Sequence, residues 1–113
     1  MATALNVFKT VTADLTTEDK IIYTAPARKT SIFLSVQATN ISNTISTINF
    51  YHGSTANVKT AVAKNFRIPY GDSMAIIGAG SKLVLETGQK VFSSASANNT
   101  IQMVISVLES AND

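Results

Sequence analysis

The stretch SIFLSVQATN, residues 31–40, predicts the fold class by its alternation of apolar and polar side chains. Four apolar residues recur at every second position: Ile32, Leu34, Val36 and Ala38. Polar residues occupy most of the positions between them, with Phe33 as the exception. Because successive side chains of a strand point to opposite faces, this period of two is typical of a half-buried antiparallel β-strand. We therefore expect the four residues to face a core and Phe33 to face outward.

The same period recurs along the chain. In STINFYH, residues 46–52, Ile48 and Phe50 share one face. Near the C-terminal end the residues sharing a face are Ile101, Met103, Ile105 and Val107. Shorter β-rich runs occur at 5–13, 20–24, 61–68, 74–77, 82–86 and 90–96. Turn-forming residues separate these runs every ~8–12 residues, a spacing that predicts an all-β sandwich or barrel.

Two segments show partial helical signals. NVKTAVAKNF, residues 57–66, has apolar residues near a 3.6-residue spacing, but it fits a strand as well. We favour the strand, because the neighbouring segments are strands and because Val and Thr are strand formers. LTTEDK, residues 15–20, begins like a capped helical turn. No periodic pattern follows it, so we expect a loop there.

The segment KLVLETGQKV, residues 82–91, combines an apolar centre with a Thr87–Gly88 turn. Its alternation predicts that Leu83 and Leu85 face the core and that Val84 faces the other way. The turn predicts a hairpin in which Glu86 lies across from Lys90, an opposite-charge pair worth only ~0.2–1 kcal/mol. The glycine-rich segment GAGSK, residues 78–82, lacks the full pattern of a phosphate-binding loop, and we expect another hairpin connection there.

The composition indicates one globular domain that packs against other protein. The chain has 113 residues, of which 45% are hydrophobic and only 14% charged. Ser, Thr and Asn supply much of the remaining surface, and such neutral groups desolvate without burying unpaired charge. The net charge is +2, from basic residues scattered along the chain, so we expect no nucleic-acid partner. No apolar run approaches the ~20 residues of a membrane span, and we expect neither a membrane partner nor a signal peptide.

Residues capable of catalysis or metal binding are sparse. The chain has no cysteine and a single histidine, His52, so thiolate and multi-histidine metal sites are excluded. Glu18 and Asp19 form the only close pair of acids, and adjacent loop residues usually point apart rather than face each other across a cleft. We therefore expect no enzyme activity, no cofactor and no metal. Of the aromatic residues, Phe50 is expected in the core, and Phe8, Phe33 and Tyr51 on a subunit interface rather than at a small ligand.

Taken in order, three segments resemble a group of small tailed-bacteriophage virion proteins: residues 21–42, 48–54 and 68–109. The features that carry the resemblance are YTAPARKT, the proline–glycine turn of IPYGD, the KLVLETG element and the final VISVLE strand. The likeness covers about residues 21–109. Arg28 stands where the pattern often has glycine. If that glycine serves a turn with positive φ, an arginine implies a different turn.

The resemblance implies a single antiparallel β-sandwich of about eight strands, either jelly-roll-like or immunoglobulin-like. It also implies a structural protein of the virion that is assembled in the host cytoplasm. The first hypothesis is a head decoration (cement) protein, oligomeric and favoured as a trimer, that bridges subunits of the major capsid protein. A neck, tail or fibre-associated structural protein is the second. A carbohydrate-binding module for host adhesion is the third.

We expect residues 1–20 to form an N-terminal arm and first strand, and residues 21–113 to form the sandwich body of the same domain. The arm lies outside the resemblance and is expected to dock on a partner, together with an exposed loop at 52–57. The residues predicted to make these protein contacts are Ala2, Thr3, Leu5, Val7, Phe8, His52, Ser54 and Asn57.

Overall fold

Nine β-strands make up the computed structural model, which describes residues 6–55, 57–78 and 81–111. The strands are β1 (Asn6–Asp14), β2 (Lys20–Thr24), β3 (Lys29–Asn40), β4 (Ser46–Thr55), β5 (Val58–Ile68), β6 (Ser73–Ile77), β7 (Leu83–Leu85), β8 (Lys90–Ala95) and β9 (Ile101–Ala111). No helix occurs in these ranges. Residues 57–66 fall almost entirely in β5, and residues 15–19 form a loop, as predicted.

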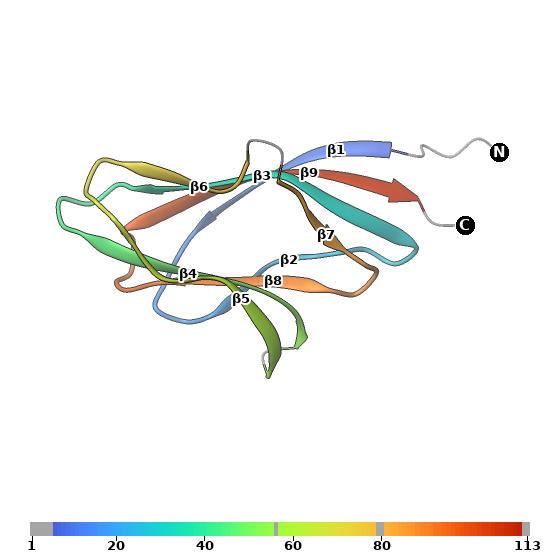
Figure 1. Ribbon diagram of the computed structural model, residues 1–113, viewed down its shortest axis with the longest axis horizontal. Coiled ribbons are helices and arrows are strands. Elements are labelled where there is room, and N and C mark those ends of the chain that lie inside the picture. The colour runs from blue at the N-terminus through green and yellow to red at the C-terminus, as the bar shows by residue number, and fades with distance from the viewer. Residues whose placement is uncertain (1–5, 56, 79–80, 112–113) are drawn as a thin grey trace.

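The strands form two antiparallel sheets packed as a sandwich (Figure 1). Sheet A has the order β1-β9-β3-β6, with β7 also paired to β3, and sheet B has the order β2-β8-β4-β5. The first strand therefore pairs with the last and the second with the last but one. The third pairs with β6 and β7, and the fourth with the fifth. This is the strand order of a jelly roll, in which a long antiparallel hairpin is rolled into two sheets. The predicted sandwich is confirmed, and of its two forms the jelly roll is the one present.

The core lies between the sheets and follows the predicted alternation on β4 and β9. Ile48 and Phe50 are fully buried. The inward residues of β9 are buried as well: Ile101, Met103, Ile105 and Val107. Leu85 is buried, and Leu83 packs against the core from its edge, also as predicted. One-sided burial of β-branched and aliphatic side chains at a period of two is what holds the register of such sheets.

On β3 the predicted alternation is wrong for the first half of the strand. Ser31 and Phe33 are buried, whereas Ile32 and Leu34 are only half-buried. The register shifts between Phe33 and Ser35, where two steps of β3 match one step of β9. Such a β-bulge inserts one extra residue, here Leu34, and reverses which side chains face the core on either side of it.

Two predicted hairpins are also wrong. β7 belongs to sheet A and β8 to sheet B, so residues 82–91 cross from one sheet to the other, and Glu86 does not lie across from Lys90. Instead, Gln89 closes the turn by accepting the backbone hydrogen bond of Glu86 at 2.8 Å and donating its own to the Glu86 carbonyl at 2.9 Å. β6 and β7 both pair antiparallel to β3, so they are two pieces of one edge strand and not the arms of a hairpin.

Arg28 has a φ of 62° in the turn that joins β2 to β3. The backbone therefore keeps the left-handed conformation that favours glycine, with an arginine in it. The expectation of a different turn is wrong. Asn65 and Asn99 have similar positive φ angles, and asparagine tolerates this region better than arginine does.

Candidate assembly interface

The predicted contact residues do not form one site. Ala2, Thr3 and Leu5 lie outside the described residues. Val7 is half-buried in β1, and Phe8 beside it is 73% exposed. Phe8 lies in sheet A and His52 lies in sheet B, so the residues predicted to act together belong to two different surfaces.

The segment 52–57 is not the exposed loop that was predicted. His52 and Ser54 belong to β4, and only Asn57 lies in the turn to β5. His52 is half-buried, and its Nε2 atom is buried with no hydrogen-bond partner among the described residues. Gly53 is buried because β5 lies directly against it. A Cβ atom there would lie 2.2 Å from the Val58 carbonyl oxygen.

Two of the aromatic residues expected on an interface are buried within the molecule. Phe33 is fully buried and meets the ring of Tyr23 edge-on, with centroids 5.4 Å apart. Tyr51 lies on sheet B but is only 7% exposed, because lysines cover it. The Lys59 and Lys64 ammonium groups lie 5.0 and 5.4 Å from its ring centroid, within cation–π range. Of the three, only Phe8 is available to a partner.

Phe8 continues into an apolar row across the outer face of sheet A. The strand register places Phe8 opposite Leu108, Leu108 opposite Ile32, and Ile32 opposite Val84. Directly paired residues of antiparallel strands share a face, so these four side chains point outward side by side. Val84 is 49% exposed, and Leu108 and Ile32 are half-buried. We call this set the apolar row.

The rest of this outer face is almost free of charge. Besides the apolar row, the register places these residues on it: Asn6, Thr10, Thr12 and Asp14 of β1; Thr30, Ser35, Gln37 and Thr39 of β3; Ser73 and Ala75 of β6; Gln102, Val104, Ser106 and Ser110 of β9. Asp14 is the only ionised side chain among them. A protein partner can therefore cover most of this face, away from Asp14, without desolvating charged groups.

A hollow of about 310 Å³ lies beside the apolar row. Its lining residues are Phe8, Lys9, Thr10, Leu34, Ser106 and Val107. Leu34, the extra residue of the β3 bulge, contributes an apolar wall that a regular strand would not offer. An apolar cavity of about 150 Å³ suffices to hold a benzene ring, so an aromatic side chain fits this hollow. Phe8 and the hollow are thus a projection and a depression on one surface.

A buried carboxylate fastens the end of the molecule beneath the apolar row. Glu109 of β9 is 1% exposed and accepts a hydrogen bond from the Tyr23 hydroxyl of β2. Its Oε1 atom lies 3.1 Å from the Lys9 Nζ atom and 3.6 Å from the Lys29 Nζ atom. The Tyr23 hydroxyl is also 2.8 Å from the Ser31 hydroxyl. This cluster joins β1, β3 and β9 of sheet A to β2 of sheet B.

Burial and hydrogen bonding shift the pKa values of this cluster. Burial alone raises the pKa of Glu109, but the Tyr23 hydrogen bond and the Lys9 and Lys29 charges outweigh it and hold that pKa below its usual range. Burial, and then the hydrogen bond to Glu109, raise the pKa of Tyr23 to about 12. Glu109 is therefore ionised and Tyr23 protonated at neutral pH, so the cluster is a structural clasp rather than an acid–base pair.

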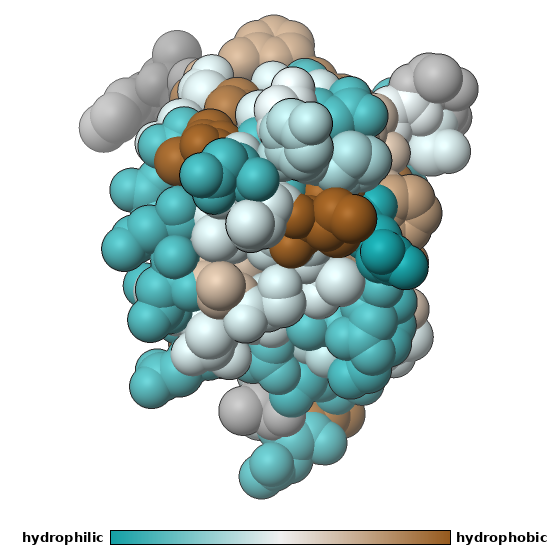
Figure 2. Space-filling view, turned by 90° about the vertical axis from the view of Figure 1, so that its left-hand side faces the viewer, coloured by the Kyte–Doolittle hydropathy of each residue, from teal (hydrophilic) through white to brown (hydrophobic). Residues whose placement is uncertain are grey.

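At the opposite end, the loop between β3 and β4 is organised by a buried asparagine. Asn40 is fully buried, and its amide donates to the carbonyl oxygens of Thr44 and Ile68 at 2.8 and 2.9 Å. Its Oδ1 atom accepts from the Ser42 backbone at 2.9 Å. Ile41 and Ile45 are each 52% exposed on this rigid loop. Figure 2 shows that this end is largely hydrophilic, with small separate apolar spots rather than a continuous patch.

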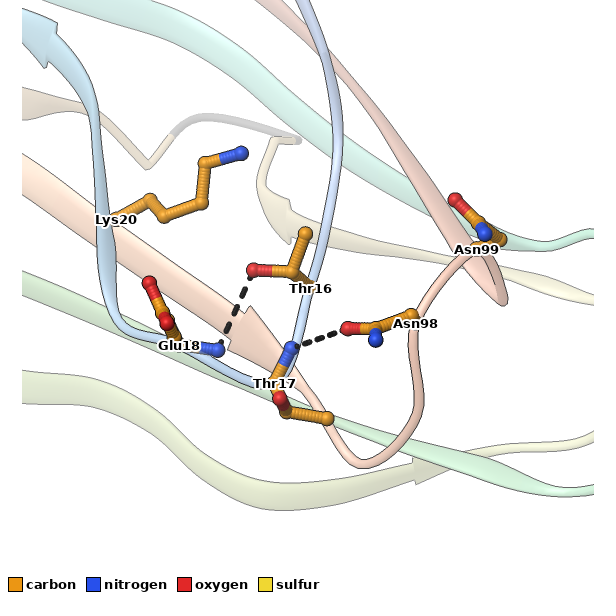
Figure 3. Close-up of a pocket in the computed structure, with 6 residues that line it drawn as sticks. All are labelled: Thr16, Thr17, Glu18, Lys20, Asn98 and Asn99. Carbon is orange, nitrogen blue, oxygen red and sulfur yellow. Dashed lines mark hydrogen bonds between the residues drawn. The ribbon is translucent and has the colours of Figure 1, made fainter.

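A shallow polar hollow of about 510 Å³ lies between the β1–β2 and β8–β9 loops (Figure 3). Its lining residues are Thr16, Thr17, Glu18, Lys20, Asn98 and Asn99. Asn98 reaches across to accept the Thr17 backbone hydrogen bond at 2.9 Å, so it ties the two loops together. None of the lining residues is aromatic. A sugar ring would therefore find hydrogen-bonding groups here but no stacking surface.

No group of three or more metal-ligating side chains occurs in the described part of the chain. Nor do the residues that the structure describes include a helix long and apolar enough to cross a membrane.

Comparison with known proteins shows the fold. No protein-family model and no curated protein sequence match the chain. A solved structure of Bacillus endospore appendages, described as a novel family of disulfide-linked pili, matches with a TM-score of 0.56 at 15% identity. That match covers 99% of this chain and 93% of the other. A structure of the infectious bursal disease virus Gx strain matches at 12% identity over 95% of this chain and 32% of that one, with a TM-score of 0.44. At 15% identity, the likeness to the endospore appendage structure shows a shared β-sandwich fold and nothing beyond the fold.

Proposed function

We propose that this protein is a non-enzymatic structural subunit of a virion, bound to the head surface as a decoration protein. The observation that carries the proposal is the outer face of sheet A, where an exposed apolar row stands on a rigid and almost uncharged surface. Partly exposed apolar residues that are rimmed by polar ones are typical of protein–protein interaction sites. Covering this face with protein is favourable, because little charge is desolvated.

The fold and the likenesses support a structural role without specifying the particle. The strand order is one that viral capsid domains use among others. The solved structure that shares the fold is that of Bacillus endospore appendages, which are pili. The specific form, a head decoration protein assembled in the host cytoplasm with the major capsid protein as partner, rests on the sequence resemblance. Several copies held together, three in the form that the resemblance favours, would bind more tightly than one through effective concentration.

The experiment that tests the proposal is co-sedimentation of the purified protein with phage heads that lack it. We expect saturable binding to heads, with Phe8→Ser reducing it and Tyr70→Ser leaving it unchanged, since Tyr70 is 66% exposed elsewhere. Binding only to necks, tails or fibres would move the protein to the second structural role. No binding to any part of the particle would overturn the proposal. Recognition of purified glycans on an array would favour the adhesion module instead.

A further inference from the structure

From the geometry we infer that the outer face of sheet A binds a second copy of this chain, with Phe8 of one copy seated in the hollow beside Leu34 and Ser106 of the next. The inference rests on the proposed function and deepens it by naming the contact between copies, so that Phe8→Ser reduces head binding by separating copies that bind the head together. It rests on the shape, charge and area of one face.

The shape of the face is complementary to itself. Phe8 is 73% exposed at the edge of the sheet, and a lone aromatic projection of this kind loses most by staying in water. The hollow next to it has room for an aromatic ring. Because projection and depression lie side by side, copies can exchange them about a symmetry axis near this face. The ring then closes with two or three copies and leaves no Phe8 uncovered.

The charges of the face favour a second copy over a charged partner. Among the described residues that the register places on this face, Asp14 is the only ionised one, and it lies at the far end of β1, where it pairs with Gln102. Lys9 lines the hollow, and its charge is paired with that of Glu109 at 3.1 Å. Two copies that meet at the apolar row therefore bring no like charges together. A partner recognised through charge would find no unpaired charge along the apolar row, whereas an identical neutral row matches it.

The area of the face is sufficient for a specific contact. Four strands about 4.8 Å apart and nine residues at about 3.3 Å each give a projected area of roughly 570 Å². A specific interface needs about 500 Å² or more from each partner. The sheet beneath is held by the Glu109 clasp and by nine unbroken pairs between β1 and β9, so little order has to be gained on binding.

The test is sedimentation equilibrium of the full chain over a concentration series, compared with Phe8→Ser and with Tyr70→Ser. We expect an oligomer of two or three copies in the unmodified protein. Phe8→Ser should raise its dissociation constant about 30-fold or more, as loss of a central aromatic anchor does. Tyr70→Ser removes an aromatic side chain of similar exposure from the β5–β6 loop and should leave the constant unchanged. Thermal unfolding checks that both variants fold.

A crosslink locates the contact independently, because the chain has no cysteine of its own. Phe8→Cys protein mixed with Leu34→Cys protein should form a disulfide between copies on mild oxidation. Tyr70→Cys mixed with Leu34→Cys should not. A chain that stays monomeric at about 100 µM, which corresponds to a binding free energy weaker than about 5.5 kcal/mol, would overturn the inference. So would an oligomer that Phe8→Ser does not weaken. If Phe8→Ser abolished head binding by a monomer, the face would belong to a coat subunit, and the proposed function would stand without this inference.

Discussion

Arg28 carries local backbone strain that a single substitution removes. Its φ of 62° costs an arginine on the order of 1 kcal/mol, which glycine does not incur. Arg28→Gly should raise the free energy of unfolding by about 0.5 kcal/mol, because the relief exceeds the added freedom of the unfolded chain. Arg28→Val should lower it by about 1 kcal/mol, because a β-branched residue fits this region worst. Urea unfolding of both variants checks the opposite signs, and equal effects would contradict the turn described here.

The Glu109 clasp should contribute to stability through a single hydroxyl. Tyr23→Phe keeps the ring against Phe33 but removes the donor to a carboxylate that is 1% exposed. Leaving a buried acceptor short of a partner costs about 1–3 kcal/mol, so the free energy of unfolding should fall by that amount. Tyr70→Phe removes an exposed hydroxyl and should change it by less than about 0.5 kcal/mol. Chemical denaturation of the two variants decides, and equal losses would show that the clasp is not stabilising.

The same cluster sets how stability depends on pH. The pKa of Glu109 is lowered on folding, so its contribution is present above its unfolded pKa of about 4.3 and is lost as the pH falls through the folded value. The pKa of Tyr23 is raised from 10.0 to about 12, so its contribution is complete below pH 10.0 and is lost as the pH rises towards 12. Unfolding curves at each pH should show both losses. In Tyr23→Phe the free energy of unfolding should fall less as the pH rises from 10 to 12. The same decrease in the variant and in the unmodified protein would show that Tyr23 does not cause it.

At the scale of the element, the β4–β5 hairpin depends on a close approach of its two strands. A Cβ atom on Gly53 would lie 2.2 Å from the Val58 carbonyl oxygen and 2.5 Å from the Lys59 Cα atom. Gly53→Ala should therefore push β5 away and lower the free energy of unfolding by about 1–3 kcal/mol. Hydrogen exchange should speed up in β5 before it does in β9.

Gly78→Ala is the matched control for this substitution. A Cβ atom on Gly78 would meet its nearest neighbour, the Ala75 Cβ atom, at 3.4 Å. That is ordinary contact, so stability should change little. Equal losses in the two alanine variants would contradict the tight pairing of β4 with β5.

The strands that the sequence predicted well are those in which one pattern runs unbroken. On β9 the apolar side chains keep a period of two, and the core follows from it. On β3 the period breaks at Leu34, and a one-residue bulge is invisible in a sequence that alternates on both sides of it. The Thr87–Gly88 turn fits a hairpin and a crossing between sheets equally well, so local chemistry does not decide between them.

The candidate interface was predictable only in part. An exposed Phe8 was expected, and the neutral composition pointed to a protein partner. Ile32, Val84 and Leu108 were missed as its neighbours, because their meeting depends on the register of four strands that are far apart in the chain. The sequence did contain one signal for this surface. Val84 and Leu108 are apolar, although the alternation places them on the outward faces of strands whose opposite faces were assigned to the core.

At the scale of the whole molecule, the surfaces are divided by end and by face. The end of the sandwich where β1 begins and β9 ends carries the apolar row and the Glu109 clasp. The opposite end carries the polar hollow and the loop that Asn40 organises. On sheet B, Lys59 and Lys64 cover Tyr51. The apolar row is the set of partly exposed apolar residues that the strand register aligns on one face, whereas exposed apolar residues such as Ile41 and Val58 lie elsewhere on the surface.

We propose that this chain is a structural subunit of a virion, present in many copies on the head. The most direct test is the number of copies per purified particle, measured by quantitative mass spectrometry and by the density of the chain in particle images. We expect on the order of hundreds of copies at symmetry-related positions on the head, whereas a closed tail ring would hold about six or twelve. Absence of the chain from purified particles would contradict it.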